Sequence, residues 1–210
     1  MTRIHVLRKR CVYHVGDPAA PPRRAHSSFE GPGLSVSEHP EEWSRIARLG
    51  AGETHALRRI DGKPGVFVDM LRRGKWRAEL EEEAVDAGLL AQETRFAVDY
   101  WDDEAEEEMT QTFVSLEEAE AEGHEGEVYE RDVLVATEPL VREHWSHRFS
   151  APLDDAIASD VAVLYLLSLT GKYDGAWWNE ELAPEVYSAP RGVIFESKLA
   201  EWDVERGGEC

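Results

Sequence analysis

Cysteine is scarce in this 210-residue chain, where Cys11 and Cys210 are the only two. We therefore expect no structural disulfide, and two thiols alone cannot complete a cysteine zinc site. Long apolar runs are also missing: the longest, 161–167, is too short to cross a bilayer. Because the N-terminus also lacks the apolar run of a signal peptide, the sequence predicts a soluble, cytoplasmic protein without a membrane partner.

Basic residues are the second shortage. The chain has 23 Lys and Arg against 43 Asp and Glu, a formal charge of -20. Such a charge argues against binding to nucleic acid or anionic membranes, because that binding draws its affinity from cations on phosphates. The basic clusters lie in the first 80 residues and the carboxylates concentrate after position 79. The charge is therefore polarised along the sequence.

The apolar pattern predicts an α+β fold, with mixed or antiparallel sheets flanked by helices. Strands are expected at 12–15, 34–37, 54–60, 65–70 and 127–137, and a hairpin of 96–101 with 109–116 around an acidic turn. Helices are expected at 38–49, 78–92 and 156–169. With 42% hydrophobic residues the chain can bury a sizeable core. We expect a single domain, 1–210, with an acidic hairpin insertion around 96–137.

Two adjacent tryptophans, Trp177 and Trp178, stand out in the late part of the chain. Successive side chains of a strand point to opposite faces, so one of the pair should stay at a surface or pocket wall, where it could stack on a ligand. The polar residues that follow would suit the positioning of a ligand in an apolar cleft: Asn179, Glu180, Ser188 and Arg191. The alternative is that the tryptophans anchor the core and Arg191 closes a buried ion pair.

Two motifs come earlier in the chain. Tyr13-His14 lies on an early strand, and Ser35-Val36-Ser37 leads into a helix with Trp43 near its start. Followed by a late carboxylate, this order of motifs resembles the ADP-ribosyltransferase fold of mono-ADP-ribosyltransferase toxins and poly-ADP-ribose polymerases. The resemblance covers most of the chain as an order of elements, and short patches of it as motifs. Taken singly, His14 also fits a satisfied strand histidine and Ser37 a helix cap.

The resemblance implies an activity and a site. NAD would be the substrate, and ADP-ribose would pass to a protein or nucleic-acid acceptor or to water, as in a toxin or phage-related factor. His14 would hydrogen-bond the adenosine-side ribose, and Glu180 would hold the nicotinamide ribose, because a carboxylate stabilises an oxocarbenium-like sugar. Asp174 stays open as an alternative acid. The remaining residues expected at the NAD site are Tyr13, Ser35, Ser37, Trp178, Ser188 and Arg191.

The sequence departs from the family's pattern in three places. Val15-Gly16 follows His14, where the family has Gly-Thr or a similar small pair. Serine stands in the middle motif where the family often has tyrosine. The strand expected to carry the late acid, 188–195, contains no carboxylate, so Arg191 falls in the acid's neighbourhood.

A different class of protein also remains open. The acidic runs 102–108 and 117–127 fit solvated turns and helix faces, but they would also suit a non-catalytic protein that mimics nucleic acid or masks a basic partner. Metal binding is not expected. His144 and His147 are three apart, whereas the zinc-protease pattern needs histidines four apart.

Overall fold

The computed structural model describes residues 4–19, 32–46, 52–103, 106–122, 126–142, 156–178 and 192–210. The chain divides into two compact units: unit 1 is Met1–Glu83 with Leu164–Cys210, and unit 2 is Ala84–Val163. Each contains strands and helices, which confirms the predicted α+β class with mixed and antiparallel sheets. No helix within the described ranges is long and apolar enough to cross a membrane.

The larger sheet of unit 1 has five strands. Their order is β1 (Val6–Lys9), β5 (Gly65–Asp69), β9 (Gly175–Trp177), β10 (Gly192–Phe195) and β3 (Gly33–Val36). β5 and β9 run parallel, and the other neighbours run antiparallel. The sequence analysis missed β1, because Arg8 and Lys9 give this segment little apolar character. Its strand state comes from pairing with β5 rather than from local pattern.

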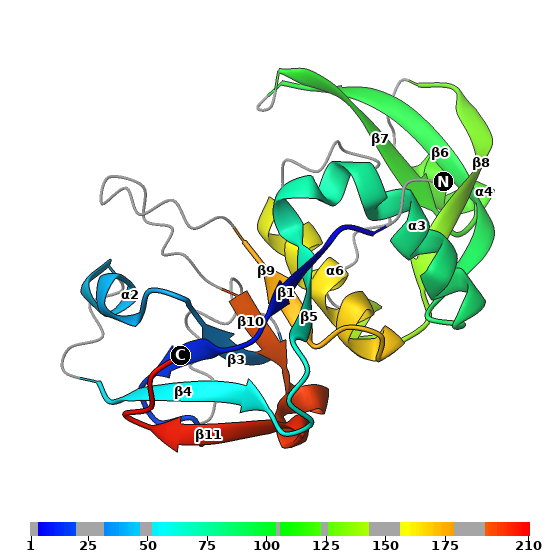
Figure 1. Cartoon of the computed structure of the whole chain (residues 1–210). Coiled ribbons are helices and arrows are strands. Elements are labelled where there is room, and N and C mark those ends of the chain that lie inside the picture. Colours follow the sequence, from blue (N-terminus) through cyan, green and yellow to red (C-terminus); the bar gives the residue numbers. More distant parts are fainter. Residues whose placement is uncertain are drawn as a thin grey trace. The chain divides into compact units, whose positions relative to one another are not determined.

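A smaller antiparallel sheet completes the strands of unit 1, in the order β11 (Trp202–Arg206), β4 (Thr54–Arg59) and β2 (Val12–Val15). β4 lies alongside β11 in Figure 1. A core cluster joins side chains of both sheets, and it consists of Val12, Val36, Leu57, Phe67, Trp177, Ile194 and Trp202. Residues 54–60 and 65–70 were correctly predicted as strand segments, but β4 and β5 belong to different sheets.

Among the described residues, α3 (Arg73–Asp86) and α6 (Ala156–Thr170) are the longer helices, and the others are short. α2 (Pro40–Ile46) follows β3, η1 (Met70–Arg72) leads into α3 (Arg73–Asp86), and η2 (Glu196–Glu201) follows β10. α6 (Ala156–Thr170) matches the helix expected at 156–169. The prediction that a helix continues to Gln92 was wrong. Gly88 adopts φ 70°, and the N–H groups of Gly88 and Leu89 donate to Val85 and Ala84 O, a glycine motif that ends helices.

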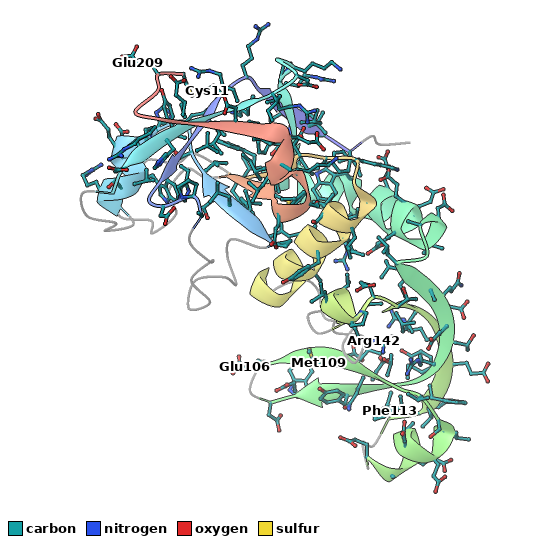
Figure 2. All side chains as sticks on the ribbon, turned by 90° about the horizontal axis from the view of Figure 1, so that it is seen from below. Cys11, Glu106, Met109, Phe113, Arg142 and Glu209 are labelled. Carbon is teal, nitrogen blue, oxygen red and sulfur yellow. A yellow bond between two sulfur atoms is a disulfide. The ribbon has the colours of Figure 1, made fainter. Side chains whose placement is uncertain are left out.

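Unit 2 is built on a three-stranded antiparallel sheet. Its order is β7 (Glu107–Phe113), β6 (Leu90–Asp102) and β8 (Val128–Ala136), with α4 (Leu116–Ala121) and α5 (Pro139–Arg142). The hairpin expected around the acidic turn is confirmed, and Glu106 marks its tip in Figure 2. A small core holds this unit together: Val98, Phe113 and Ala119, with Phe96 and Val128 packed against them. The insertion expected around 96–137 lies inside this unit.

Cys11 and Cys210 form a disulfide, so the expectation that they stay unpaired was wrong. Their Cα atoms lie 5.4 Å apart although 199 positions separate them. The prediction rested on the scarcity of cysteine, which carries no information on strand order. β11 pairs with β4 and β4 pairs with β2, which returns the last residue to Cys11. Figure 2 shows Cys11 and Glu209 at the same end of unit 1. Disulfides persist mainly in oxidising compartments, so this bond is unusual for a protein in the predicted cytoplasmic location. That location stays a prediction.

Candidate functional site

The two early motifs meet in unit 1. His14 on β2 and Ser35 on β3 are 21 positions apart, and His14 Nδ1 lies 2.8 Å from the carbonyl oxygen of Ser35. A carbonyl oxygen only accepts, so Nδ1 is the donor of this hydrogen bond. Both residues are buried, with His14 9% exposed. The contact holds the His14 ring in one orientation.

Within the described ranges, two buried polar atoms on β3 and β4 have no hydrogen-bond partner. Ser35 Oγ is one, and Nδ1 of His55 is the other. His55 on β4 pairs directly with His14 across the antiparallel strands, so both side chains lie on the same face of the sheet. A buried polar group without a partner costs roughly 1–3 kcal/mol and calls for an explanation, such as a ligand that supplies the missing bond. We take His14, Ser35 and His55 as the candidate site.

The sequence analysis missed His55. Its segment was expected to be a strand, but nothing local indicates which residue of a strand will face His14. The register of β2 against β4, His14 with His55 and Val12 with Leu57, supplies that information. A histidine at an inward position of a predicted strand was the one available signal.

Tyr13 and Ser37 lie next to the candidate site, but their polar groups are used within the fold. The two residues exchange backbone hydrogen bonds of 2.8 Å and thereby link β2 to β3. Ser37 Oγ accepts from the backbone N–H of His39. α2 begins at Pro40, and the His39 carbonyl accepts the first helical bond from Trp43, so the N-cap position falls on His39, and the predicted capping role of Ser37 was wrong. The Tyr13 hydroxyl accepts from the backbone N–H of Cys210. These residues position the strands, and their part in NAD binding stays a prediction.

An aromatic side chain from α2 closes against His14. The ring centroids of Trp43 and His14 are 6.2 Å apart with an edge-to-face angle of 63°. Trp43 is buried and also packs on Val15. Gly16 follows with φ 121°, a conformation that a side chain rarely adopts. The small residue after Val15 is thus required by the backbone turn that leaves β2.

The tryptophan pair divides as strand alternation predicts. Trp177 is buried in the core of unit 1, edge-on to Phe67 at 5.5 Å, and Lys9 Nζ lies 4.5 Å from its ring centroid. Trp178 is half-buried, just after β9. β10 lies between β9 and β3, so two strand spacings, about 9–10 Å, separate β9 from the strand of Ser35. Trp177 is therefore a core anchor, and Trp178 is the member with a partly open face.

Asp174 has a structural role. Its Oδ2 accepts from the backbone N–H of Val66 at 2.7 Å, and its Oδ1 accepts from Arg59. Arg59 also bonds Asp61, and this bond is the largest cause that raises the pKa of the guanidinium above its usual range, while burial opposes it. Both oxygens of Asp174 already have partners within unit 1. This geometry gives no support to Asp174 as the acid that would hold a ribose.

Several predicted residues lie outside the described ranges: Asn179, Glu180, Ser188 and Arg191 of the proposed ligand segment, and His144 and His147 of the rejected zinc pattern. Their roles stay predictions. In the part of the chain that is described, no three side chains among His, Cys, Asp and Glu gather as a metal site would need.

Comparison with known proteins does not assign this chain to a family. No family model matches the chain, and neither a curated protein nor a solved structure matches it. The function is therefore argued from the geometry of the candidate site.

Proposed function

We propose that unit 1 binds NAD and transfers its ADP-ribose group to a macromolecular acceptor, or to water. The observation that carries the proposal is the contact of His14 with Ser35. The two motifs on which the resemblance to ADP-ribosyltransferases rests are distant in sequence, yet they lie on neighbouring strands and touch. Ser35 Oγ and His55 Nδ1 add two buried polar atoms that have no hydrogen-bond partner among the described residues, one on Ser35 itself and one on the residue that pairs with His14.

The reaction needs orientation more than acid or base strength. The bond between the ribose C1′ and the nicotinamide nitrogen breaks, its electron pair stays on nicotinamide, and nicotinamide leaves neutral. The acceptor's N–H or O–H attacks C1′ and gives its proton to water. Because the sugar is cationic in the transition state, a carboxylate beside it lowers the barrier. From the sequence this role is assigned to Glu180.

The described residues would bind and orient NAD. His14 contacts the adenosine-side ribose, as the resemblance implies, and its hydrogen bond to the Ser35 carbonyl holds the ring in place. The Ser35 hydroxyl bonds the nicotinamide carboxamide. His55 Nδ1 takes a further polar group of the dinucleotide. The bonds to Ser35 Oγ and His55 Nδ1 would satisfy two buried atoms that have no partner among the described residues, so binding and folding would support each other.

Nicotinamide release by the purified protein tests this proposal. His14→Ala and Glu180→Gln should each lower release at least a hundredfold, since each removes a group that orients or stabilises the reacting ribose. Ser35→Ala should raise KM with little change in the free energy of unfolding, because the lost hydroxyl has no partner among the described residues. Ser197→Ala, which removes an exposed hydroxyl from η2, is the matched control and should behave as the wild type.

Folding of each variant is checked by circular dichroism before the assay. NAD binding is measured separately, by calorimetric titration to millimolar concentration. A folded wild-type protein that neither binds NAD in this range nor releases nicotinamide would overturn the proposal.

A further inference from the structure

One face of the unit 2 sheet carries an exposed tryptophan. The register of the strands places Trp101 opposite Glu108 and Asp99 opposite Thr110, and Tyr129 lies on the same face through its pairing with Ala97. Trp101 is 62% exposed and Tyr129 37%. We call these five residues, Asp99, Trp101, Glu108, Thr110 and Tyr129, the Trp101 face. Two aromatic side chains on one sheet face, with their rings open to solvent, offer a contact surface for a partner.

The core of unit 2 lies on the opposite side of the sheet. Val98, Phe113 and Val128 belong to the other set of alternating positions and pack with Ala119 of α4. Trp101 therefore cannot reach this core without a shift of register by one residue, which would turn the core residues outward. Exposure of Trp101 is a consequence of the packing of the sheet.

The Trp101 face is also held rigid. Oδ1 of Asp99 accepts hydrogen bonds from Thr110 Oγ1 at 2.5 Å and from the Tyr129 hydroxyl at 2.9 Å. One carboxylate thus links side chains from all three strands, because Asp99 is on β6, Thr110 on β7 and Tyr129 on β8. A face that is already ordered loses little conformational entropy when a partner binds.

The charge around this face selects the kind of partner. Residues 84–163 contain 22 Asp and Glu and four Arg, with no Lys, which gives unit 2 a formal charge of -18. Within the described ranges Arg95 pairs with Glu93, whereas Asp103, Glu106 and Glu108 form no ion pair. A second copy, nucleic acid and an anionic membrane would all be repelled. A cationic polypeptide is the complement.

We propose that the Trp101 face docks an arginine-rich segment of a partner protein. A guanidinium is planar, so it stacks on the indole of Trp101 and at the same time forms paired hydrogen bonds with the carboxylate of Glu108. Lysine, a compact charge with a strong hydration shell, gains less from the ring. This docking requires no NAD, so it holds or fails separately from the proposed transferase activity.

Fluorescence anisotropy with a labelled nine-residue arginine peptide tests the proposal, in 0.15 M NaCl and without NAD. We expect Trp101→Ala to weaken binding roughly fivefold, the effect of losing one exposed cation–π contact. Leu140→Ala, which truncates another exposed apolar side chain of unit 2, should change the affinity less than twofold. The nine-residue lysine peptide should bind more weakly than the arginine peptide.

A second pair of variants separates a local site from general attraction. Glu108→Gln and Glu117→Gln each remove one charge from unit 2, but Glu117 belongs to α4 and is not part of the Trp101 face. Glu108→Gln should weaken arginine-peptide binding severalfold and Glu117→Gln should hardly change it. Equal effects of the two glutamates, with Trp101→Ala silent, would overturn the proposal, as would preferred binding of duplex DNA or of a second copy. Trp101→Phe keeps a stacking ring and should retain part of the affinity.

Discussion

The two units of this protein differ in net charge and in how far their carboxylates are paired. Unit 1 contains 21 Asp and Glu and 19 Lys and Arg, so its formal charge is -2, whereas unit 2 carries -18. In unit 1 carboxylates are structural partners: Asp174 bonds Arg59, Glu38 bonds Lys9 and Glu81 bonds Arg77. In unit 2 a pairing of this kind joins Glu93 to Arg95, among residues that the structure describes. The total of -20 is thus a property of one part of the molecule.

This difference supports the two proposals in different ways. A nearly neutral unit with buried ion pairs and unpartnered polar atoms at His55 and Ser35 suits a small-molecule site. An acidic sheet with an exposed tryptophan suits the recognition of a cationic chain. The composition of the whole sequence averages the two units and therefore hides the difference between them.

The largest expected effect is the loss of the central ion pair of unit 1. Arg59→Ala should lower the free energy of unfolding by about 3–5 kcal/mol, because it leaves the buried carboxylate of Asp174 with an uncompensated charge. The matched control is the neighbouring Arg58→Ala, whose partner Glu205 is exposed, and its cost should stay below about 1 kcal/mol. Urea denaturation measures both. Equal costs would show that pairing in unit 1 is a surface effect.

Loss of the disulfide should have the second largest effect on the free energy of unfolding. Replacing Cys11 and Cys210 together by serine should lower the free energy of unfolding by about 2–4 kcal/mol, since the bond closes a loop that spans nearly the whole chain. Hydrogen exchange should place the loss in β2, β4 and β11 rather than in β6–β8. A reducing agent should destabilise the wild type and leave the double variant unchanged. If reduction left the free energy of unfolding unchanged, the disulfide would not be what stabilises unit 1 relative to unit 2.

Salt should stabilise unit 2 selectively. Between 0.1 M and 1 M NaCl the screening length falls from about 10 Å to about 3 Å, which weakens repulsion among the carboxylates of 84–163. Amide exchange should therefore slow in β6, β7 and β8, while exchange in β4 and β11 should not slow. The combined variant Asp103→Asn, Glu106→Gln and Glu108→Gln should show part of the same slowing at low salt. Equal slowing of amide exchange in both units would contradict the expectation that charge repulsion is confined to unit 2.

The smallest effect concerns an exposed carboxylate of unit 1. The hydrogen bond from Arg59 is the main cause that lowers the pKa of Asp61 to about 2, from an ordinary value of 3.8. The folded state holds the proton more weakly than the unfolded chain, so this group stabilises the fold above pH 4 and loses that contribution as the pH falls toward 2. An NMR titration of the Asp61 carboxyl should show this midpoint. A midpoint near 4 would mean that Arg59 pairs with Asp174 in solution and does not bond Asp61.

Local pattern was enough to predict much of this protein. Alternation located the strands at 12–15, 34–37 and 127–137, and also the outward and inward tryptophans of the 177–178 pair. The acidic turn predicted the hairpin of β6 and β7. These features depend on residues that are near one another in the chain, so a sequence window contains their causes.

Tertiary structure decided the rest. The pairing of β1 with β5, the bond between Cys11 and Cys210, and the position of His55 opposite His14 all depend on long-range register. Asp174 likewise acquires its partners only when β5, β9 and β4 come together. Apolar alternation determines that a segment forms a strand and which face it buries, but many pairings satisfy that requirement equally well. The choice among them is made by the packing of the whole unit, and with it the composition of the site.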